Sequence, residues 1–302
     1  MQRALLFYLA VLCYNLLVTI FLVINYIVKG NKLNNKIKTL YFSATGTTEK
    51  IVKRLAQELY NNMEDYKQVE HFNFTLPPQR IEAVNYNKED IVIVGIPVYA
   101  GRVPNVFLKY LNSIKANGAL AIAMVVYGNR NYDDALIELK DILEINGFQV
   151  IAAGTFIGEH SFSYTLAKGR PDNEDYALIK EFAHEIYLKL LSDKKTVEVP
   201  GEKPYRNYYK PKNKDGEFVD IRKVVPKTNE DCNDCKKCAR VCPMGSIDFD
   251  DTSQLNGICI KCGACIKKCP INAKYFDDKN YLNHKHELEI DFAERKKPEF
   301  FI

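Results

Sequence analysis

Eight of the nine cysteines fall into two copies of one spacing pattern near the C-terminus of the chain. The first copy reads Cys232-x-x-Cys235-x-x-Cys238-x-x-x-Cys242-Pro, and the second reads Cys259-x-x-Cys262-x-x-Cys265-x-x-x-Cys269-Pro. Three thiolates spaced in this way lie on one concave side of short turns and can bind three irons of one cube, while the fourth cysteine leaves the turn and binds the other cube. The pattern therefore predicts two 4Fe-4S clusters, one held by Cys232, Cys235, Cys238 and Cys269 and the other by Cys259, Cys262, Cys265 and Cys242.

Two other uses of cysteine compete with this interpretation. A zinc site usually takes four ligands in two pairs, which leaves the third cysteine of each triplet without a function. A disulfide framework also uses an even number of cysteines, but it does not require the same proline-terminated spacing twice. The ninth cysteine, Cys13, lies in an apolar run and is interpreted as packing.

Residues 226–278 resemble the two-cluster bacterial ferredoxins. The segments that follow the two cysteine runs also repeat, because residues 243–251 and 270–278 both begin with proline and end in Phe-Asp-Asp. The resemblance implies a small α+β domain in which each half contributes a short helix and two short strands around its cluster.

The length and charge of the chain limit its class. The 302 residues allow about two domains. The net charge of +4 is too small to indicate nucleic-acid binding. Exposed clusters require a reducing cytosol or anaerobic assembly, so we expect the body of the protein to lie in the cytoplasm.

An apolar run precedes the rest of the chain. Residues 4–28 carry no charged side chain and are long enough to span a bilayer as a helix. Lysines follow this run, and the positive-inside rule then places the body on the cytoplasmic side of the cell membrane. Residues 1–35 are thus predicted to be a single-pass anchor with a basic flank. The alternative is a mis-assigned translation start, with a cytoplasmic protein that begins near Lys36.

Residues 36–192 alternate short apolar segments with amphipathic ones, which predicts an α/β domain with a doubly wound parallel sheet of five strands. The expected strands cover residues 37–42, 70–74, 91–96, 119–127 and 150–156. The expected helices cover residues 49–61, 106–116, 132–146 and 173–192. In such sheets ligands bind at the carboxyl ends of the strands.

The loop after the first expected strand reads Ser43-Ala44-Thr45-Gly46-Thr47-Thr48. A loop that runs from a strand into a helix start offers N–H groups and hydroxyls to a phosphate. It lacks the lysine of nucleoside triphosphate loops. It resembles the phosphate loop of flavodoxins, which implies FMN and the binding positions Ser43, Thr45, Gly46, Thr47 and Thr48. The alternative is an ordinary helix cap.

Two further loops, residues 97–104 and 127–132, follow expected strands at the same edge. Flavodoxin-like proteins hold the isoalloxazine ring with these loops, and the resemblance implies the positions Pro97, Tyr99, Gly101, Tyr127, Gly128 and Asn129. Tyr99 is the first candidate for stacking on the ring, and Gly101 would let the backbone approach it. Gly128 and Asn129 would meet its polar edge. His160 is expected near the same edge, as a proton donor or as a hydrogen-bonding loop residue.

The remaining segments are a linker (193–225), which we expect to lie along the flavin domain, and a C-terminal tail (279–302). From Lys36 onward the chain resembles the flavodoxin–ferredoxin fusion proteins of anaerobic bacteria. This resemblance implies electron transfer between the clusters and FMN, ending at a small molecule or a quinone. The alternatives are a carrier that docks with a partner redox enzyme, and a redox or oxygen sensor.

Overall fold

The computed structural model describes residues 36–63, 69–212 and 216–302. The predicted anchor, residues 4–28, lies outside these residues. Within the described part of the chain, no helix has both the length and the apolar character that crossing a membrane requires.

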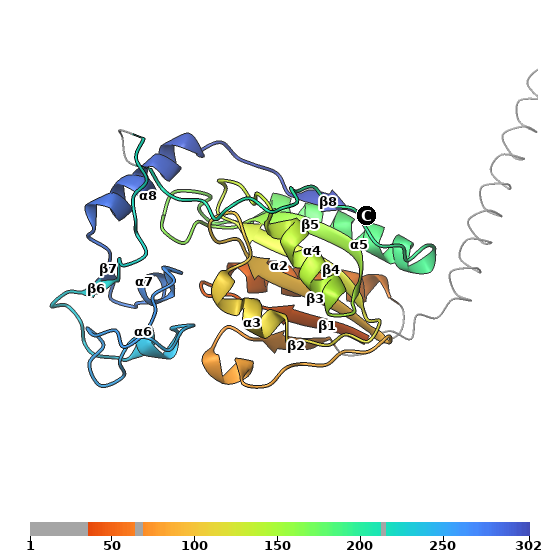
Figure 1. Ribbon diagram of the computed structural model, residues 1–302, viewed down its shortest axis with the longest axis horizontal. Helices are drawn as coiled ribbons and strands as arrows, with labels where there is room; N and C mark the ends of the chain where they lie inside the picture. The colour runs from red at the N-terminus through yellow and green to blue at the C-terminus, as the bar shows by residue number, and fades with distance from the viewer. Residues whose placement is uncertain (1–35, 64–68, 213–215) are drawn as a thin grey trace, which may run out of the picture.

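A six-stranded sheet forms the centre of the larger domain, residues 36–192, which we call the sheet domain (Figure 1). The strand order is β2-β1-β3-β4-β5-β8. The strands are β1 (Lys36–Tyr41), β2 (Glu70–Asn73), β3 (Asp90–Pro97), β4 (Leu120–Tyr127), β5 (Gln149–Ile157) and β8 (Glu299–Phe301). The first five are parallel, which confirms the doubly wound fold class. Residues of β3 and β4 are apolar and buried on both sides, as expected for a parallel sheet covered on two faces.

The expected count of five strands was wrong, because the C-terminal tail adds β8 antiparallel to β5. Phe300 stacks on Phe182 with ring centroids 4.5 Å apart and also contacts Phe156. This apolar contact holds the tail on the edge of the sheet and covers an otherwise open row of backbone hydrogen-bonding groups.

Helices cover both faces of the sheet. On one face lie α2 (Thr47–Asn62) and α5 (Asn173–Leu191), and on the other lie α3 (Leu108–Leu111) and α4 (Ala135–Ile145). The apolar side of α2 is fully buried through Ile51 and Leu55, each of which contributes roughly 1.5–3 kcal/mol. This helix approaches β3 so closely that a Cβ atom at Gly95 would lie 2.2 Å from Val52.

The helix expected over residues 106–116 is much shorter. A 3-10 turn (Asn105–Phe107) leads into α3, which ends at Leu111. Beyond it, the backbone at Lys115 pairs with residues 84 and 86 through N–H···O bonds of 3.3 and 2.7 Å. This bridge to a distant loop replaces the helical hydrogen bonds that the local sequence pattern favours.

The cysteine domain, residues 226–278, lies beyond the carboxyl ends of the parallel strands (Figure 1). It contains the strand pair β6 (Lys227–Thr228) and β7 (Lys274–Tyr275) and the short helices α6 (Lys237–Arg240) and α7 (Ala264–Lys267). After it, α8 (Lys279–Asp291) leads the chain back to β8.

The linker lies along the sheet domain. The Tyr208 hydroxyl donates to the Val103 carbonyl at 2.8 Å, and the Tyr209 N–H donates to the Ala100 carbonyl at 2.9 Å. The Arg102 guanidinium lies over the rings of Tyr205 and Tyr208. These contacts attach the chain between the two domains to the loop after β3.

Candidate functional site

In the described part of the chain, the loop between β1 and α2 leaves several backbone N–H groups without a partner at the start of a helix. The Ser43 N–H donates to Thr75 Oγ1 at 2.8 Å, and Ser43 Oγ accepts from the Glu49 N–H at 3.0 Å. Gly46 takes a left-handed conformation with φ 97° at the start of the helix. Among the described residues, the N–H groups of residues 44–48 have no acceptor. Free N–H groups at the positive end of a 16-residue helix suit a phosphate.

The structure does not support an ordinary side-chain cap at this loop. The residue before α2 is Gly46, and no side chain caps the helix there. The side chains of Thr45 and Thr47 are partly exposed. Thr47 also reaches Gly158, where a Cβ atom would lie 2.2 Å from its methyl group. The loop after β5 thus borders the phosphate loop.

The two loops expected to hold the flavin ring lie side by side. The Asp134 N–H donates to the Gly101 carbonyl at 3.1 Å. A Cβ atom at Gly101 would lie 2.0 Å from Asp133 Oδ2, and one at Gly128 would lie 2.2 Å from the His160 ring. Both glycines are therefore required by neighbouring side chains of this chain, in addition to any approach to a cofactor.

Two expected ring-binding residues have other contacts. The buried Asn129 amide donates to the carbonyls of Phe292 and Glu294 at 2.6 and 2.7 Å, so its side chain holds the segment after α8 instead of facing a flavin. Tyr127 is 4% exposed and packs against Tyr132 with ring centroids 5.7 Å apart. Burial raises the pKa of Tyr127 to about 12. The binding roles expected for Tyr127 and Asn129 stay predictions, and Gly128 offers its backbone beside them.

Tyr99 lies between the sheet domain and the cysteine domain. Its ring meets Phe42 edge-on with centroids 6.4 Å apart. Burial raises the Tyr99 pKa well above its ordinary value, and the nearby thiols of Cys262 and Cys259 add to this effect. Pro97, two residues before Tyr99, ends β3. The residue expected to stack on a flavin thus borders the second cysteine motif.

His160 is a hydrogen-bonding loop residue in this structure. Its Nδ1 accepts from the Phe162 N–H at 3.1 Å, and its ring lies edge-on to Phe162. Burial, together with nearby cationic side chains, lowers its pKa to about 4. The imidazole is therefore neutral at pH 7.

The cysteines of the two motifs are free thiols. Four of them line one small cavity with apolar neighbours that include Ile247 and Ile260. These four are Cys242, Cys259, Cys262 and Cys265, the set that the spacing pattern assigns to one cluster. Of the remaining four, Cys235 is exposed and Cys238 is buried. Backbone N–H groups point at the two crossing ligands, since Ser246 donates to Cys242 Sγ at 3.4 Å and Ala273 donates to Cys269 Sγ at 3.2 Å.

Burial disfavours the thiolate forms of three of the cavity cysteines. Burial raises the pKa of Cys262 to about 12 and also raises those of Cys259 and Cys265. Binding of iron must therefore displace protons from these thiols. In the part of the chain that the structure describes, no three His, Cys, Asp or Glu side chains are arranged to hold a single metal ion.

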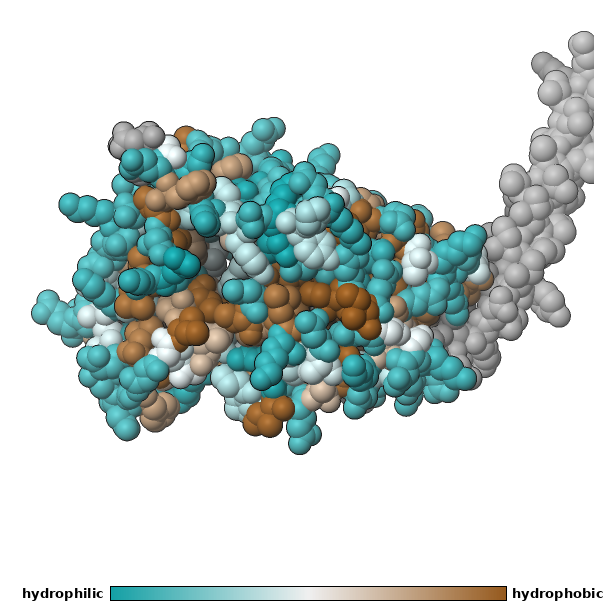
Figure 2. All heavy atoms as spheres, in the orientation of Figure 1, coloured by the Kyte–Doolittle hydropathy of each residue, from teal (hydrophilic) through white to brown (hydrophobic). Residues whose placement is uncertain are grey.

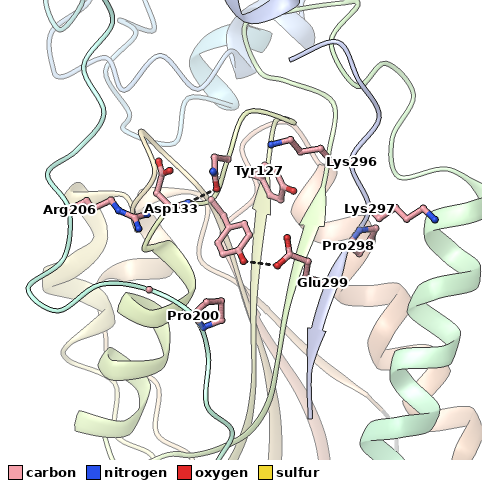
Figure 3. Close-up of a pocket in the computed structure, with 11 residues that line it drawn as sticks. Tyr127, Asp133, Pro200, Arg206, Lys296, Lys297, Pro298 and Glu299 are labelled. Carbon is pink, nitrogen blue, oxygen red and sulfur yellow. Dashed lines mark hydrogen bonds between the residues drawn. The ribbon is translucent and has the colours of Figure 1, made fainter. Parts of the chain in front are cut away.

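A cavity of about 570 Å³ lies beside the loop after β4 (Figure 3). Three distant segments line it: residues 127–133, the linker at Pro200–Arg206 and the tail at Lys296–Glu299. The Tyr132 hydroxyl donates to Glu299 Oε2 at 2.7 Å across it. Sequence reasoning missed this cavity because its walls are up to 170 residues apart, and only the tyrosines and lysines of the linker hinted at an ordered segment.

Comparisons with known proteins support both domains. A model described as "Flavodoxin domain" matches residues 39–156, and one described as "4Fe-4S dicluster domain" matches residues 189–284. No curated protein matches the chain.

Solved structures similar to the chain include a flavodoxin from the domain Archaea, which is 16% identical in sequence and has a TM-score of 0.36. The match covers 51% of this chain and 98% of the flavodoxin. A Fusobacterium nucleatum flavodoxin bound to flavin mononucleotide has 20% identity, the same coverages and a TM-score of 0.36. Rubredoxin oxygen:oxidoreductase from Desulfovibrio gigas has 20% identity, 53% and 37% coverage, and a TM-score of 0.38. Each model matches less than half of the chain, and together they suggest an iron–sulfur flavoprotein for electron transfer.

Proposed function

We propose that the protein passes electrons between two 4Fe-4S clusters and an FMN held at the carboxyl edge of the sheet, and that it reduces a small-molecule acceptor. The observation that carries this proposal is the position of the cysteine domain. Its second motif lies on the loops expected to hold the flavin, with Tyr99 beside Cys259 and Cys262. An electron would therefore cross a short, buried path instead of open solvent.

The residues of the sheet domain supply binding and orientation. The free N–H groups of residues 44–48 would bind the phosphate of FMN, with the hydroxyls of Thr45 and Thr47 close by. Tyr99 and the backbone of residues 97–101 and 127–129 would border the ring. When bound, FMN converts single-electron transfers into two-electron chemistry. The neutral imidazole of His160, beside Gly128, would hold a proton near the carboxyl edge of the sheet.

The cavity beside Tyr127 supports a small-molecule acceptor. Its lining combines the tyrosine rings with the cations Arg206, Lys296 and Lys297 and with two carboxylates (Figure 3). A concave site with aromatic walls and a few charged groups is typical of small-molecule binding. The mixed charges favour a polar or anionic aromatic compound over a long apolar chain.

A second candidate function is that of an electron carrier. Cys235 is exposed, so a partner redox protein can approach the cluster that it would hold. Such a partner is the proposed donor in the reductase and the proposed acceptor in the carrier. If residues 4–28 anchor the chain, a membrane quinone or a membrane-bound partner would take this place.

Anaerobic purification and reduction by dithionite test these proposals. We expect FMN and about eight irons per chain. Rapid reoxidation by quinone analogues or nitro compounds would support the reductase, whereas reoxidation only by a redox protein would support the carrier. Protein that contains iron but cannot bind FMN would contradict both.

A further inference from the structure

The two halves of the cysteine domain differ in how deeply they are buried. Around the first motif, residues 233–235 are exposed, whereas residues 262–265 of the second motif are all buried. Cys262 and Cys265 are each 9% exposed, and Cys238 is the one cysteine of the first motif that is buried to the same extent. Cys262 and Ala264 belong to the apolar core on the α3 and α4 side of the sheet. The second motif is therefore packed into the sheet domain, and Figure 2 shows apolar side chains gathered where the two domains meet.

Direct contacts attach the second motif to the loop after β5. Lys267 Nζ lies 2.5 Å from Glu159 Oε1 and donates to the Ser163 carbonyl at 2.6 Å. A Cβ atom at Gly263 would lie 2.6 Å from the Ser161 carbonyl oxygen, so only glycine permits this approach. The loop after β5 also borders the phosphate loop through Gly158 and Thr47. The second motif thus contacts the loop after β5, which in turn borders the phosphate loop.

Arg80 links the phosphate loop to the residue after Cys242, which is an expected ligand of the same cluster as Cys259, Cys262 and Cys265. Its guanidinium donates to the Thr75 carbonyl at 2.5 Å and to the Pro243 carbonyl at 2.6 Å. Thr75 Oγ1 in turn accepts from the Ser43 N–H of the phosphate loop at 2.8 Å. Pro243 directly follows Cys242, which lines the cavity of the second motif. One side chain therefore connects the phosphate loop to the residue after a cluster ligand.

We propose that the cluster held by Cys242, Cys259, Cys262 and Cys265 exchanges electrons directly with the flavin. The cluster held by Cys232, Cys235, Cys238 and Cys269 then exchanges electrons with the external redox protein. This order rests on the proposed function and adds a sequence of carriers to it. Electron tunnelling falls exponentially with distance, so the half of the domain that contacts the flavin loops takes the inner position. In each step one carrier loses one electron and its neighbour gains it, and no bond in the protein forms or breaks.

The order of the clusters can be tested without measuring activity. The Cys262→Ala and Cys235→Ala variants, each expected to lose one cluster, assign the electron paramagnetic resonance signals of the reduced protein. FMN is then added to iron-loaded, flavin-free wild-type protein. We expect FMN to change the signal and midpoint potential of the Cys262-dependent cluster, which is the one missing from Cys262→Ala. The signal and midpoint potential of the Cys235-dependent cluster, which is missing from Cys235→Ala, should stay constant. A response of the Cys235-dependent cluster alone, an equal response of both or no response with FMN bound would overturn the order.

A variant that keeps every cysteine protects the test against misfolding. Arg80→Gln should change the potential of a single cluster, the one whose signal responds to FMN, because Arg80 contacts the residue after Cys242. Arg54→Gln is the matched control, since Arg54 pairs with Glu58 on α2 at 2.7 Å and its loss changes the net charge equally. If Arg80→Gln changes neither cluster, or changes the one that ignores FMN, the order is overturned. Failure of FMN to bind the wild type would instead overturn the proposed function.

Discussion

The sheet domain and the cysteine domain are stabilised by different means. The sheet domain has an apolar core on each face of its sheet, and each core is built from many fully buried side chains. The cysteine domain has one small buried cluster of its own, formed by Cys238, Ile247 and Cys265, two of which are expected iron ligands, whereas its Cys262 and Ala264 pack into a core of the sheet domain. Small domains with so little core are commonly stabilised by a metal. From this difference we expect the sheet domain to fold before any cofactor binds, and the cysteine domain to depend on the proposed clusters.

Removal of iron should produce the largest difference in stability between the two domains. Anaerobic chelation should unfold the cysteine domain because its ligands then lose their common partner. The Cys235→Ser variant, which is expected to lose one cluster, should lower the stability of the domain without unfolding it. Hydrogen exchange should show loss of protection in residues 226–278 and retained protection in β3 and β4. Equal loss in both domains would contradict the difference between them.

A substitution that creates a cavity in the core of the sheet domain tests whether this domain is stabilised independently of the cysteine domain. Leu55 is fully buried on α2, so Leu55→Ala should lower the free energy of unfolding by about 2–5 kcal/mol in urea. The iron content should stay unchanged. Gln57→Ala, on the exposed side of the same helix, is the control and should change stability by less than about 0.5 kcal/mol. Parallel loss of iron in Leu55→Ala would argue against independent stabilisation.

Acidification should lower the free energy of unfolding, because His160 is held uncharged in the folded protein. Its pKa is lowered from 6.5 to about 4, so the unfolded chain binds a proton that the folded chain does not bind between these values. Stability is therefore full above pH 6.5 and falls as the pH drops toward 4, by up to roughly 3 kcal/mol. Thermal unfolding midpoints between pH 7 and pH 5 measure the effect. The His160→Gln variant should have a flatter profile, and an equally steep profile would assign the pH dependence to other groups.

Loss of the Tyr99 ring is expected to have the smallest effect. Tyr99→Ala should weaken FMN binding by up to about tenfold, the value of one aromatic contact. Tyr99→Phe keeps the ring and should bind FMN almost as the wild type does. Fluorescence titration with FMN measures the affinity, and the iron content serves as a second measurement. A fall in iron as large as the fall in FMN affinity would mean that Tyr99 mainly supports the cysteine domain.

Local patterns in the sequence were sufficient to predict the five parallel strands of the sheet and the grouping of the cysteines. The expected strand at 91–96 became β3 (Asp90–Pro97), because an uninterrupted apolar run has few alternatives to a buried strand. The spacing pattern also grouped Cys242 with Cys259, Cys262 and Cys265, and these four line one cavity.

Contacts between distant segments could not be predicted from such patterns. β8 depends on Phe300 packing against Phe182, and Asn129 binds carbonyls more than 160 residues away. The helix expected at 106–116 was shortened because Lys115 pairs with the loop at residues 84–86. In each case a partner far along the chain decided the outcome, and no local spacing encodes it.

The central claim, electron transfer between FMN and the clusters within one chain, is tested most directly by flash photoreduction. The flavin of the oxidised, fully loaded protein is reduced by a light pulse, and the cluster absorbance is followed at several protein concentrations. The account predicts that the clusters are reduced in a first-order process whose rate constant does not depend on protein concentration. A rate constant proportional to concentration, or clusters that stay oxidised while the flavin is reduced, would contradict it.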